Sequence, residues 1–234
     1  MNEVESKKMR NKIPETLGII MDGNRRWAKR KGKSSLYGHQ AGYKKLEEVI
    51  EWAVEHKIKN VIVYAFSTEN WNRTKTEVGG LMRLLKFVLT KKINEWNKKG
   101  VEIGFIGNRT HFSKEIQSMM KKAEKQKPDK KIIRVISAQS YGGRDEIIRA
   151  VQKIVKNKKA VSEKEFSNLL DTKDVPDPDL IIRTGGEIRI SNFLLWQGAY
   201  SELFFTNTLW PDFSKKEFTN ILNAFTKRER RNGK

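Results

Sequence analysis

Arginine side chains recur in the segments that follow the apolar runs of this sequence. Five of them are Arg25, Arg26, Arg73, Arg183 and Arg189. Guanidinium groups match phosphate oxygens in bidentate pairs, and a neutral ligand would not need so many of them. The carboxylate of Asp22 lies inside this positive set, where a hard cation bridging a carboxylate and phosphate oxygens would explain it. These residue types therefore predict a site for diphosphates and Mg²⁺.

The apolar, β-branched runs that precede these segments are typical of buried strands. We predict strands at Leu17–Met21, Asn60–Phe66, Val101–Ile106, Ile132–Ile136 and Leu180–Ile182. Apolar residues at helical spacing predict helices at Tyr43–Glu55, Glu77–Lys98, Ser113–Lys125, Arg144–Lys156, Ser162–Leu170 and Ser214–Arg228. Strands that alternate with helices of this length indicate crossover connections. The sequence therefore predicts an α/β fold, a single domain with a central, mainly parallel β-sheet flanked by helices.

Polar segments follow four of the predicted strands. They are Asp22–Trp27, Ser67–Arg73, Ser140–Arg144 and Arg183–Asn192. Ligands of an open parallel sheet bind beyond the carboxyl ends of its strands, so these segments are expected to converge on one edge. The glycine-containing turn at Asp22–Arg26 also opens a predicted helix, whose free N–H groups favour an anion. Neither a P-loop nor a dinucleotide-binding glycine pattern accompanies the segments, so the sequence gives no support for a nucleotide site.

Composition sets the remaining bounds. The chain has 234 residues, which suit one domain over 1–234, with 1–12 expected to be flexible and 229–234 expected to form a tail. It has no cysteine, no secretion-type leader and no apolar run long enough for a membrane span, so we expect a cytoplasmic protein. The formal net charge of +20 would attract nucleic acid, anionic lipid or polyphosphate. The basic residues are spread along the chain rather than clustered, which argues against nucleic acid as a partner.

Five blocks of the sequence resemble the ordered signature of a known family. They are "IIMDGNRRWAKRKG", "GHQAG", "YAFSTENWNR", "YGGRDEI" and "RTGGEIRISNFLLWQGAYSELFF…LWPDF". In order and spacing they resemble the cis-prenyltransferases, the undecaprenyl, decaprenyl and dehydrodolichyl diphosphate synthases. The resemblance implies the fold of that family rather than the all-α fold of the trans-prenyltransferases, whose aspartate-rich motifs are absent.

The same resemblance implies an activity in isoprenoid biosynthesis. A Mg²⁺-dependent transferase of prenyl groups would condense isopentenyl diphosphate onto an allylic primer, farnesyl or geranylgeranyl diphosphate. The product would be a Z-polyprenyl diphosphate, an undecaprenyl-like lipid carrier for cell-envelope or glycan synthesis. The family further implies a homodimer. Because such a product would be nearly insoluble in water and the chain carries a charge of +20, we also expect peripheral association with the cytoplasmic membrane face for product release, and no nucleic acid partner.

The resemblance also implies roles for individual residues. Asp22 and Asn70 are implied to be catalytic, Asp22 by holding Mg²⁺ and Asn70 by assisting proton removal from isopentenyl diphosphate. Glu202 matches a second metal-associated carboxylate. The implied substrate-binding residues are Gly23, Asn24, Arg25, Arg26, Trp27, His39, Ser67, Thr68, Glu69, Trp71, Arg73, Arg183, Arg189, Ile190, Ser191, Arg231 and Gly233. The last two belong to an Arg-x-Gly tail that is expected to reach the partner subunit's isopentenyl diphosphate site.

Three positions depart from the common bacterial pattern. Arg25 replaces a glycine, Ser35 stands where many bacterial members carry a diphosphate-binding arginine, and Ser140 stands where asparagine is frequent. These departures bear on the choice of primer, which the sequence leaves open together with the product length.

Other interpretations of the same residues remain. Asp22-Gly23-Asn24 alone would suit a turn and helix cap, and His39 alone would suit a helix start. A basic RNA-binding module would need clustered charge or an RRM or KH pattern, which the sequence lacks. A non-catalytic subunit of a two-component cis-prenyltransferase would have lost the first-block aspartate, and Asp22 is present.

Overall fold

A computed structural model describes residues 13–158 and 160–228 and contains a six-stranded parallel sheet. Its order is β3-β4-β2-β1-β5-β6, and each neighbouring pair runs parallel. The strands are β1 (Thr16–Ile20), β2 (Asn60–Ser67), β3 (Val101–Ile106), β4 (Ile133–Tyr141), β5 (Leu180–Arg183) and β6 (Glu202–Phe205). The predicted α/β architecture is confirmed. The sequence did not predict β6, and β4 runs five residues beyond the predicted end.

The strands carry apolar side chains on both faces, because helices or loops cover both. In β1, Leu17 and Ile19 join the larger buried cluster, whereas Ile20 joins the cluster on the opposite face. All five residues of β1 are buried. Such continuous apolar runs are typical of parallel strands, and they explain why β1 and β2 were recognisable from sequence.

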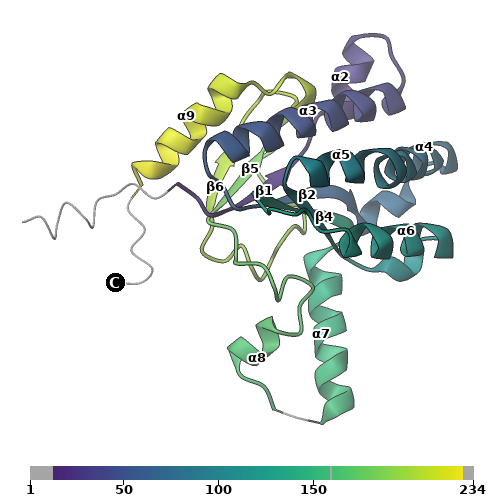
Figure 1. Ribbon diagram of the computed structural model, residues 1–234, viewed down its shortest axis with the longest axis vertical. Helices are drawn as coiled ribbons and strands as arrows, with labels where there is room; N and C mark the ends of the chain where they lie inside the picture. The colour runs from purple at the N-terminus through teal and green to yellow at the C-terminus, as the bar shows by residue number, and fades with distance from the viewer. Residues whose placement is uncertain (1–12, 159, 229–234) are drawn as a thin grey trace, which may run out of the picture.

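Helices of ordinary length cover the sheet. They are α2 (Asn24–Arg30), α3 (Ser35–Glu55), α4 (Lys75–Phe87), α5 (Ile93–Lys98), α6 (Lys114–Lys125), α7 (Gly143–Asn157), α8 (Glu163–Ser167) and α9 (Lys215–Thr226). α3 to α6 lie together over one face of the sheet, and α9 packs into the same buried cluster (Figure 1). A π-helical turn at Val88–Lys92 separates α4 from α5, so the single predicted helix Glu77–Lys98 is divided.

Helix α3 begins at Ser35, eight residues before its predicted start. Its first turn is capped by Ser34, whose hydroxyl accepts a hydrogen bond from the N–H of Tyr37 at 3.3 Å. Gly38 and Gly42 lie where α3 meets the start of α2. A Cβ on Gly38 would lie 2.1 Å from the backbone oxygen of Asn24, and one on Gly42 would lie 2.2 Å from its side-chain oxygen. The two glycines therefore let α2 pack directly on α3.

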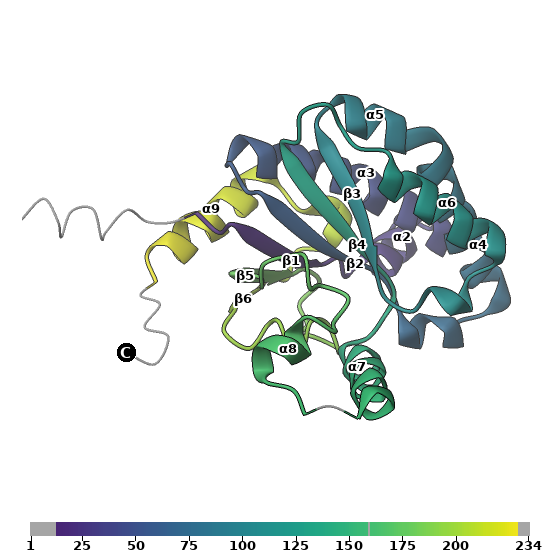
Figure 2. The same cartoon turned by 60° about the horizontal axis from the view of Figure 1, so that its bottom comes forward.

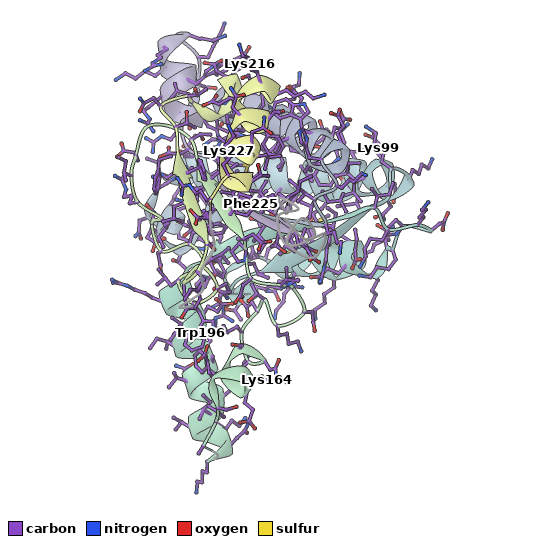
Figure 3. The ribbon with its side chains drawn as sticks, turned by 90° about the vertical axis from the view of Figure 1, so that its left-hand side faces the viewer. Lys99, Lys164, Trp196, Lys216, Phe225 and Lys227 are labelled. Atoms are coloured by element: carbon purple, nitrogen blue, oxygen red, sulfur yellow. The ribbon has the colours of Figure 1, made fainter. Side chains whose placement is uncertain are left out.

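The other face of the sheet is covered by the chain segment around Phe193, which packs into a second buried cluster with Tyr141 and Leu194. The ring of Phe193 stacks on Tyr64 of β2 with centroids 4.6 Å apart. α7 and α8 extend from this side of the sheet, as Figure 2 shows. Trp196 holds α8 in place: its ring lies 4.5 Å from Phe166 and its Nε1 donates to the hydroxyl of Ser167 at 3.0 Å. In Figure 3 Trp196 lies beside α7 and α8, well away from α9.

Within residues 13–158 and 160–228, none of the helices combines the length and the apolar character that crossing a bilayer requires. The expected flexible segment 1–12 and the expected tail 229–234, with Arg231 and Gly233, lie outside the described residues.

Candidate active site

The carboxyl ends of β1, β2 and β5 meet at one edge of the sheet. Ile20 of β1 pairs with Arg183 of β5, so Asp22 follows two residues beyond that pair. Ser67, at the end of β2, lines the same cavity as Asp22 and Arg183. The structure thus brings together three of the polar segments that the sequence placed after strands.

Asp22 is paired with two arginines. Its Oδ2 accepts from Nη2 of Arg183 at 2.8 Å, and its Oδ1 lies 3.2 Å from Nη2 of Arg26. The Arg183 side chain is only 5% exposed, and its Nε has no hydrogen-bond partner among the described residues. A buried guanidinium with unused hydrogen-bonding capacity next to a cavity can bind an anionic oxygen.

The backbone of Asp22 is also held firmly. Its carbonyl oxygen accepts from the hydroxyl of Thr184 at 2.8 Å and from the N–H of Trp210 at 3.0 Å. The next residue, Gly23, has φ of +116°, and a Cβ there would lie 2.9 Å from Leu209. Glycine is therefore required at this position, both for the left-handed backbone and for the close packing.

Arg183 also connects Asp22 to the segment that follows β5. Its Nη1 donates to the hydroxyl of Ser191 at 2.7 Å and to the carbonyl of Arg189 at 2.6 Å. The Arg189 side chain is exposed and pairs with Glu187. Ile190 packs against the cluster on the α7 side of the sheet. Arg183 and Ser191 thus face the cavity, and Arg189 approaches them through its backbone.

Glu77 was not among the residues that the sequence singled out, yet it joins several of them. Its Oε1 accepts from Nη1 of Arg73 at 2.9 Å and from the hydroxyl of Ser35 at 3.2 Å. Nε of Arg25 lies 3.5 Å from the same oxygen, and Nε2 of His39 lies 3.9 Å from it. A glutamate four residues after an arginine at a helix start is the only sequence signal for this role, and it is too common to be distinctive.

His39 is neutral at physiological pH in this environment. Burial, together with the positive charges of Arg73 and Arg25, lowers the pKa of His39 to about 4, although Glu77 acts in the opposite direction. Its Nε2 is buried without a hydrogen-bond partner among the described residues. A neutral imidazole beside arginines can donate or accept one hydrogen bond without adding charge.

Two adjoining cavities open from this group of residues. The smaller, of 620 Å³, is mainly basic; its wall is Met21, Asp22, Gly23, Asn24, Arg25, Arg26, Lys29, Gly32, Lys33, Ser35, His39 and Arg73. The larger, of 720 Å³, shares Asp22, His39 and Arg73 with it and has a mostly apolar wall. A charged opening thus leads directly into an apolar interior.

The larger cavity runs between the sheet and α3 to α5. Strand residues on its wall include Val63, Ile103, Phe105 and Val135, and Trp96 comes from α5. The π-helical turn begins at Val88, which lines the same cavity. π-Helical turns often occur beside functional sites, because they displace the helix axis locally.

The segment after β2 forms the short 3₁₀ helix η1 (Thr68–Asn72) at the mouth of this cavity. Glu69 and Asn70 line the mouth, and Oδ1 of Asn70 accepts from the N–H of Ser67 at 3.1 Å. Trp71 packs away from the mouth, where its Nε1 donates to the hydroxyl of Ser140 at 2.8 Å. Ser140 has φ of +50°, a conformation that asparagine also tolerates.

Several predicted site residues line neither cavity: Trp27, Thr68, Trp71, Arg189, Ile190 and Glu202. Trp27 stacks on Tyr37 of α3 with centroids 5.9 Å apart, and its Nε1 donates to Asp212 at 2.6 Å. These contacts hold α2 against α3 and the Trp210–Asp212 turn. Glu202 begins β6 opposite Leu180, and its carboxylate is paired with Arg228. That position is at the other end of the sheet from Asp22, about 15 Å along the strand direction. A single chain therefore does not bring Glu202 to Asp22.

The described side chains at this edge supply only some of the ligands that a Mg²⁺ ion needs. Within the described part of the chain, no group of three or more His, Asp or Glu side chains could hold a metal ion by itself. Mg²⁺ in phosphate-transfer sites is commonly held by one or two carboxylates together with substrate phosphates and water. Asp22, with 30% of its side chain exposed, supplies one such carboxylate beside the basic cavity. The donor set therefore fits a metal ion that binds together with a diphosphate.

The fold and this edge together define a class: a parallel α/β protein whose arginine-lined site opens into an apolar cavity, suited to an anionic head group with a long apolar chain. Residues 20–233 match the family model described as "Putative undecaprenyl diphosphate synthase". The chain belongs to this family and is a prenyl transferase of the undecaprenyl diphosphate synthase type, a cis-prenyltransferase. The resemblance seen in the signature blocks is thereby confirmed.

Relatives match along nearly their whole length. An isoprenyl transferase of Aquifex pyrophilus is 48% identical over 224 residues, which cover 95% of this chain and 97% of the relative. The (2E,6E)-farnesyl-diphosphate-specific ditrans,polycis-undecaprenyl-diphosphate synthase of Photorhabdus laumondii is 42% identical over 228 residues, covering 94% of this chain and 90% of that protein.

Two solved structures are similar in fold. Lavandulyl diphosphate synthase from Lavandula x intermedia, in complex with dimethylallyl diphosphate, has a TM-score of 0.89 at 33% identity and covers 95% of this chain and 99% of its own. A "probable undecaprenyl diphosphate synthase" from Campylobacter jejuni has a TM-score of 0.81 at 34% identity and covers 94% of this chain and 99% of its own.

Proposed function

We propose that the protein extends farnesyl or geranylgeranyl diphosphate with isopentenyl diphosphate units, in a Mg²⁺-dependent reaction that yields a Z-polyprenyl diphosphate. The product would be an undecaprenyl-like lipid carrier for the cell envelope or for glycan synthesis. The observation that carries this proposal is the direct passage from the basic cavity into the 720 Å³ apolar cavity, through Asp22, His39 and Arg73. A growing polyprenyl diphosphate needs a basic site for its diphosphate and, directly beside it, an apolar space for its hydrocarbon chain.

The chain's own residues have distinct tasks in this proposal. Arg25, Arg26 and Arg73 bind the allylic diphosphate and stabilise the charge that develops on it as the allylic C–O bond breaks. Asp22 would hold Mg²⁺, which when bound neutralises diphosphate charge as a Lewis acid. Arg183 and Ser191 bind the diphosphate of isopentenyl diphosphate.

The new bond requires that a proton leave C2 of isopentenyl diphosphate. Asn70 lies at the mouth of the apolar cavity, beside Glu69. Its side-chain oxygen is held by the N–H of Ser67 at 3.1 Å, which fixes the amide's orientation. In the proposed reaction Asn70, through a water molecule, assists transfer of the C2 proton to the departing diphosphate, and the apolar wall keeps bulk water from the allylic cation.

The test is incubation with labelled isopentenyl diphosphate and one primer at a time, geranyl, farnesyl or geranylgeranyl diphosphate, followed by chromatographic sizing of the products. We expect a ladder that ends in a long polyprenyl diphosphate, with activity lost in EDTA and restored by Mg²⁺. Absence of incorporation with every primer in the presence of Mg²⁺ would contradict the proposal. Full activity in EDTA would contradict its metal requirement alone.

We also propose a homodimer. An apolar stripe on α7 supports it: Ile148, Val151 and Val155 recur on one face and are 56%, 40% and 69% exposed. β6 adds an open sheet edge with Leu203 39% exposed. An unpartnered strand edge and an exposed apolar stripe favour burial against a second copy. Sedimentation should give twice the chain mass for the wild type and a smaller species for Val155→Glu.

The Arg-x-Gly tail is proposed to complete the partner subunit's isopentenyl diphosphate site. Mixing Asp22→Ala with Arg231→Ala should then restore activity, because a mixed dimer contains one site with both features intact. Mixed samples no more active than the average of the two parents would contradict the exchange.

A cytoplasmic protein that binds peripherally to the membrane completes the proposal. The net charge of +20 favours anionic lipid, and a long polyprenyl product is nearly insoluble in water. Flotation with anionic vesicles at low salt should recover the protein, whereas neutral vesicles should not. Equal recovery with both would contradict the electrostatic part.

A further inference from the structure

Asn192 lies where three strand-following segments of the sheet edge meet. One is η1, which follows β2; the second is the Gly142–Arg144 turn, which follows β4; the third is its own segment after β5. Asn192 also lines the mouth of the 720 Å³ cavity. None of the tasks assigned above uses it.

The side-chain amide of Asn192 is bonded at both ends. Its Nδ2 donates to Oε1 of Glu69 at 2.9 Å, and its Oδ1 accepts from the N–H of Arg144 at 2.9 Å. Its backbone oxygen also accepts from the N–H of Gly143 at 2.7 Å. At neutral pH, where a carboxyl group is ionised and only accepts, the asparagine amide is the short side chain that donates at one end and accepts at the other. One residue thereby joins all three segments.

The surroundings of Asn192 are shaped for this contact. Its φ of +66° lies in the left-handed region, which asparagine, aspartate and glycine adopt most readily. A Cβ on Gly142 would lie 2.7 Å from Nδ2 of Asn192 and 2.6 Å from the hydroxyl of Thr68. Gly142, the first glycine of the "YGGRDEI" block, is therefore needed to let the amide and η1 approach.

The neighbours of the two bonded residues belong to different halves of the proposed reaction. Ser191, which precedes Asn192, accepts from Arg183 and faces the isopentenyl diphosphate side. Asn70, which follows Glu69, is the group proposed to assist proton removal. The Asn192–Glu69 bond therefore fixes the distance between the place where the diphosphate is held and the place where its C2 proton leaves.

We propose that Asn192 is a positioning residue that holds the Ser191 segment against η1, and so aligns isopentenyl diphosphate with Asn70. The inference rests on the proposed function. Burial alone would raise the pKa of Glu69, but the hydrogen bonds from Asn192 and from its own segment outweigh burial and lower it, so Glu69 stays an acceptor.

The first variant is Asn192→Gly, which keeps the left-handed backbone accessible and removes both side-chain bonds. We expect kcat to fall about 10- to 100-fold, the effect of a misplacement of about 1 Å, and the KM for isopentenyl diphosphate to rise. The KM for the allylic diphosphate should stay within about twofold, because Asn192 touches none of the residues proposed to bind it. Thermal unfolding of each variant is measured alongside.

The decisive experiment is a double-mutant cycle of Asn192→Asp and Glu69→Gln. Aspartate is matched in size and tolerates the same backbone, and it still accepts from Arg144, but it faces Glu69 with a second carboxylate. In the Glu69→Gln background the new glutamine amide can donate to the new aspartate, so the bond returns with its polarity reversed. We expect Asn192→Asp to lower kcat at least tenfold in the wild-type background and less than threefold in the Glu69→Gln background.

Equal fold losses in the two backgrounds would overturn the proposal, as would parallel changes in both KM values that track a loss of thermal stability. All variants of the cycle are assayed together with the wild-type protein. A wild type that incorporates no isopentenyl diphosphate overturns the proposed function and this inference together. An active wild type with an additive cycle overturns the role of Asn192 alone.

Discussion

Arg183, buried at the end of β5, donates to Oδ2 of Asp22 at 2.8 Å, while Arg26 approaches Oδ1 at 3.2 Å. Both oxygens of the carboxylate therefore face guanidinium groups. A diphosphate competes for the same guanidiniums, and its binding would free Asp22 for a cation. The pairing favours metal and diphosphate arriving together rather than metal binding alone.

The contacts of Asp22 with the two arginines predict what its substitution does to turnover and to stability. Asp22→Ala should lower turnover at least ~10³-fold, the scale of a lost electrostatic contact to a developing charge. Because Asp22 compensates the buried Arg183, we expect the variant also to lose about 1–3 kcal/mol of stability. Steady-state kinetics and urea unfolding measure the two effects separately.

Asp22→Asn is the matched control. Its amide oxygen keeps an acceptor for Arg183, while the charge and the acceptor for Arg26 are lost, so its stability should lie nearer the wild type while turnover stays low. Retention of more than a tenth of wild-type turnover in either variant would contradict the role assigned to Asp22.

Arg25 and Ser35 both approach the same oxygen of Glu77. We therefore predict that an arginine at position 35 can take over the role of the arginine at position 25. Arg25 Nε and Ser35 Oγ lie 3.5 Å and 3.2 Å from Oε1 of Glu77, and both residues line the basic cavity. Arg25 therefore places a guanidinium where a long side chain at position 35 would also reach. Arg25→Gly should raise the allylic KM about tenfold or more, as expected for a lost charge-assisted hydrogen bond.

Adding Ser35→Arg to Arg25→Gly should bring the allylic KM back to within a few-fold of wild type. Lys164→Ala serves as control for the overall field, because it removes the same charge from α8 (Figure 3), which contributes no residue to the basic cavity. If the double variant binds the primer no better than Arg25→Gly, the two positions are not interchangeable and the prediction is wrong.

His39 should make the protein less stable in mild acid. Burial, with help from Arg73 and Arg25 and against Glu77, lowers its pKa from 6.5 to about 4. Between these two values the unfolded chain binds the proton and the folded chain does not. The free energy of unfolding should therefore fall as pH drops from 6.5 towards 4, by up to about 3 kcal/mol from this group.

The comparison that isolates His39 is urea unfolding of wild type and His39→Gln across this pH range. The wild-type curve should drop more steeply on acidification, and the two should run parallel above pH 7. Parallel curves throughout would show that His39 is not held neutral by the fold.

The segments after β1, β2 and β5 could be placed from sequence because continuous apolar runs ending in polar clusters leave few alternatives in a parallel sheet. β6 could not, since its four residues form an edge strand with mixed exposure, and such a short half-exposed run has no distinctive period. The start of α3 was missed for a related reason. Gly38 and Gly42 weaken the helical pattern, and only the close approach of Asn24 explains them.

The candidate site likewise contains residues that the sequence predicted and residues that it did not. Residue types predicted the arginines and Asp22, but not Glu77 or Asn192, whose roles depend on contacts between segments far apart in the chain. Glu202 shows the opposite case. A motif match assigned it to the metal, whereas the register of β6 places it at the far end of the sheet from Asp22. Its assignment stays a prediction that one chain's geometry does not support.

The depth of the apolar cavity should set product length, and β4 offers a graded test. Ser137 and Val135 both line the cavity, and Val135 lies two residues, about 7 Å, farther from the carboxyl edge. A phenylalanine at either position would fill part of the space that the growing chain enters. Val135→Phe should therefore shorten the product, and Ser137→Phe should shorten it more.

Initial rates with a short primer should stay within a few-fold of wild type in both variants, because neither residue lines the basic cavity. Ile136, between them, faces the opposite cluster, so the near-isosteric Ile136→Met controls for disturbance of β4 without entering the cavity. Products are sized by chromatography after labelling with isopentenyl diphosphate. Unchanged lengths in both phenylalanine variants, or a shorter product from Val135→Phe than from Ser137→Phe, would mean that the chain grows elsewhere. The ordered series would instead fix the direction of growth, from Asp22 at the edge towards Val135 and Trp96.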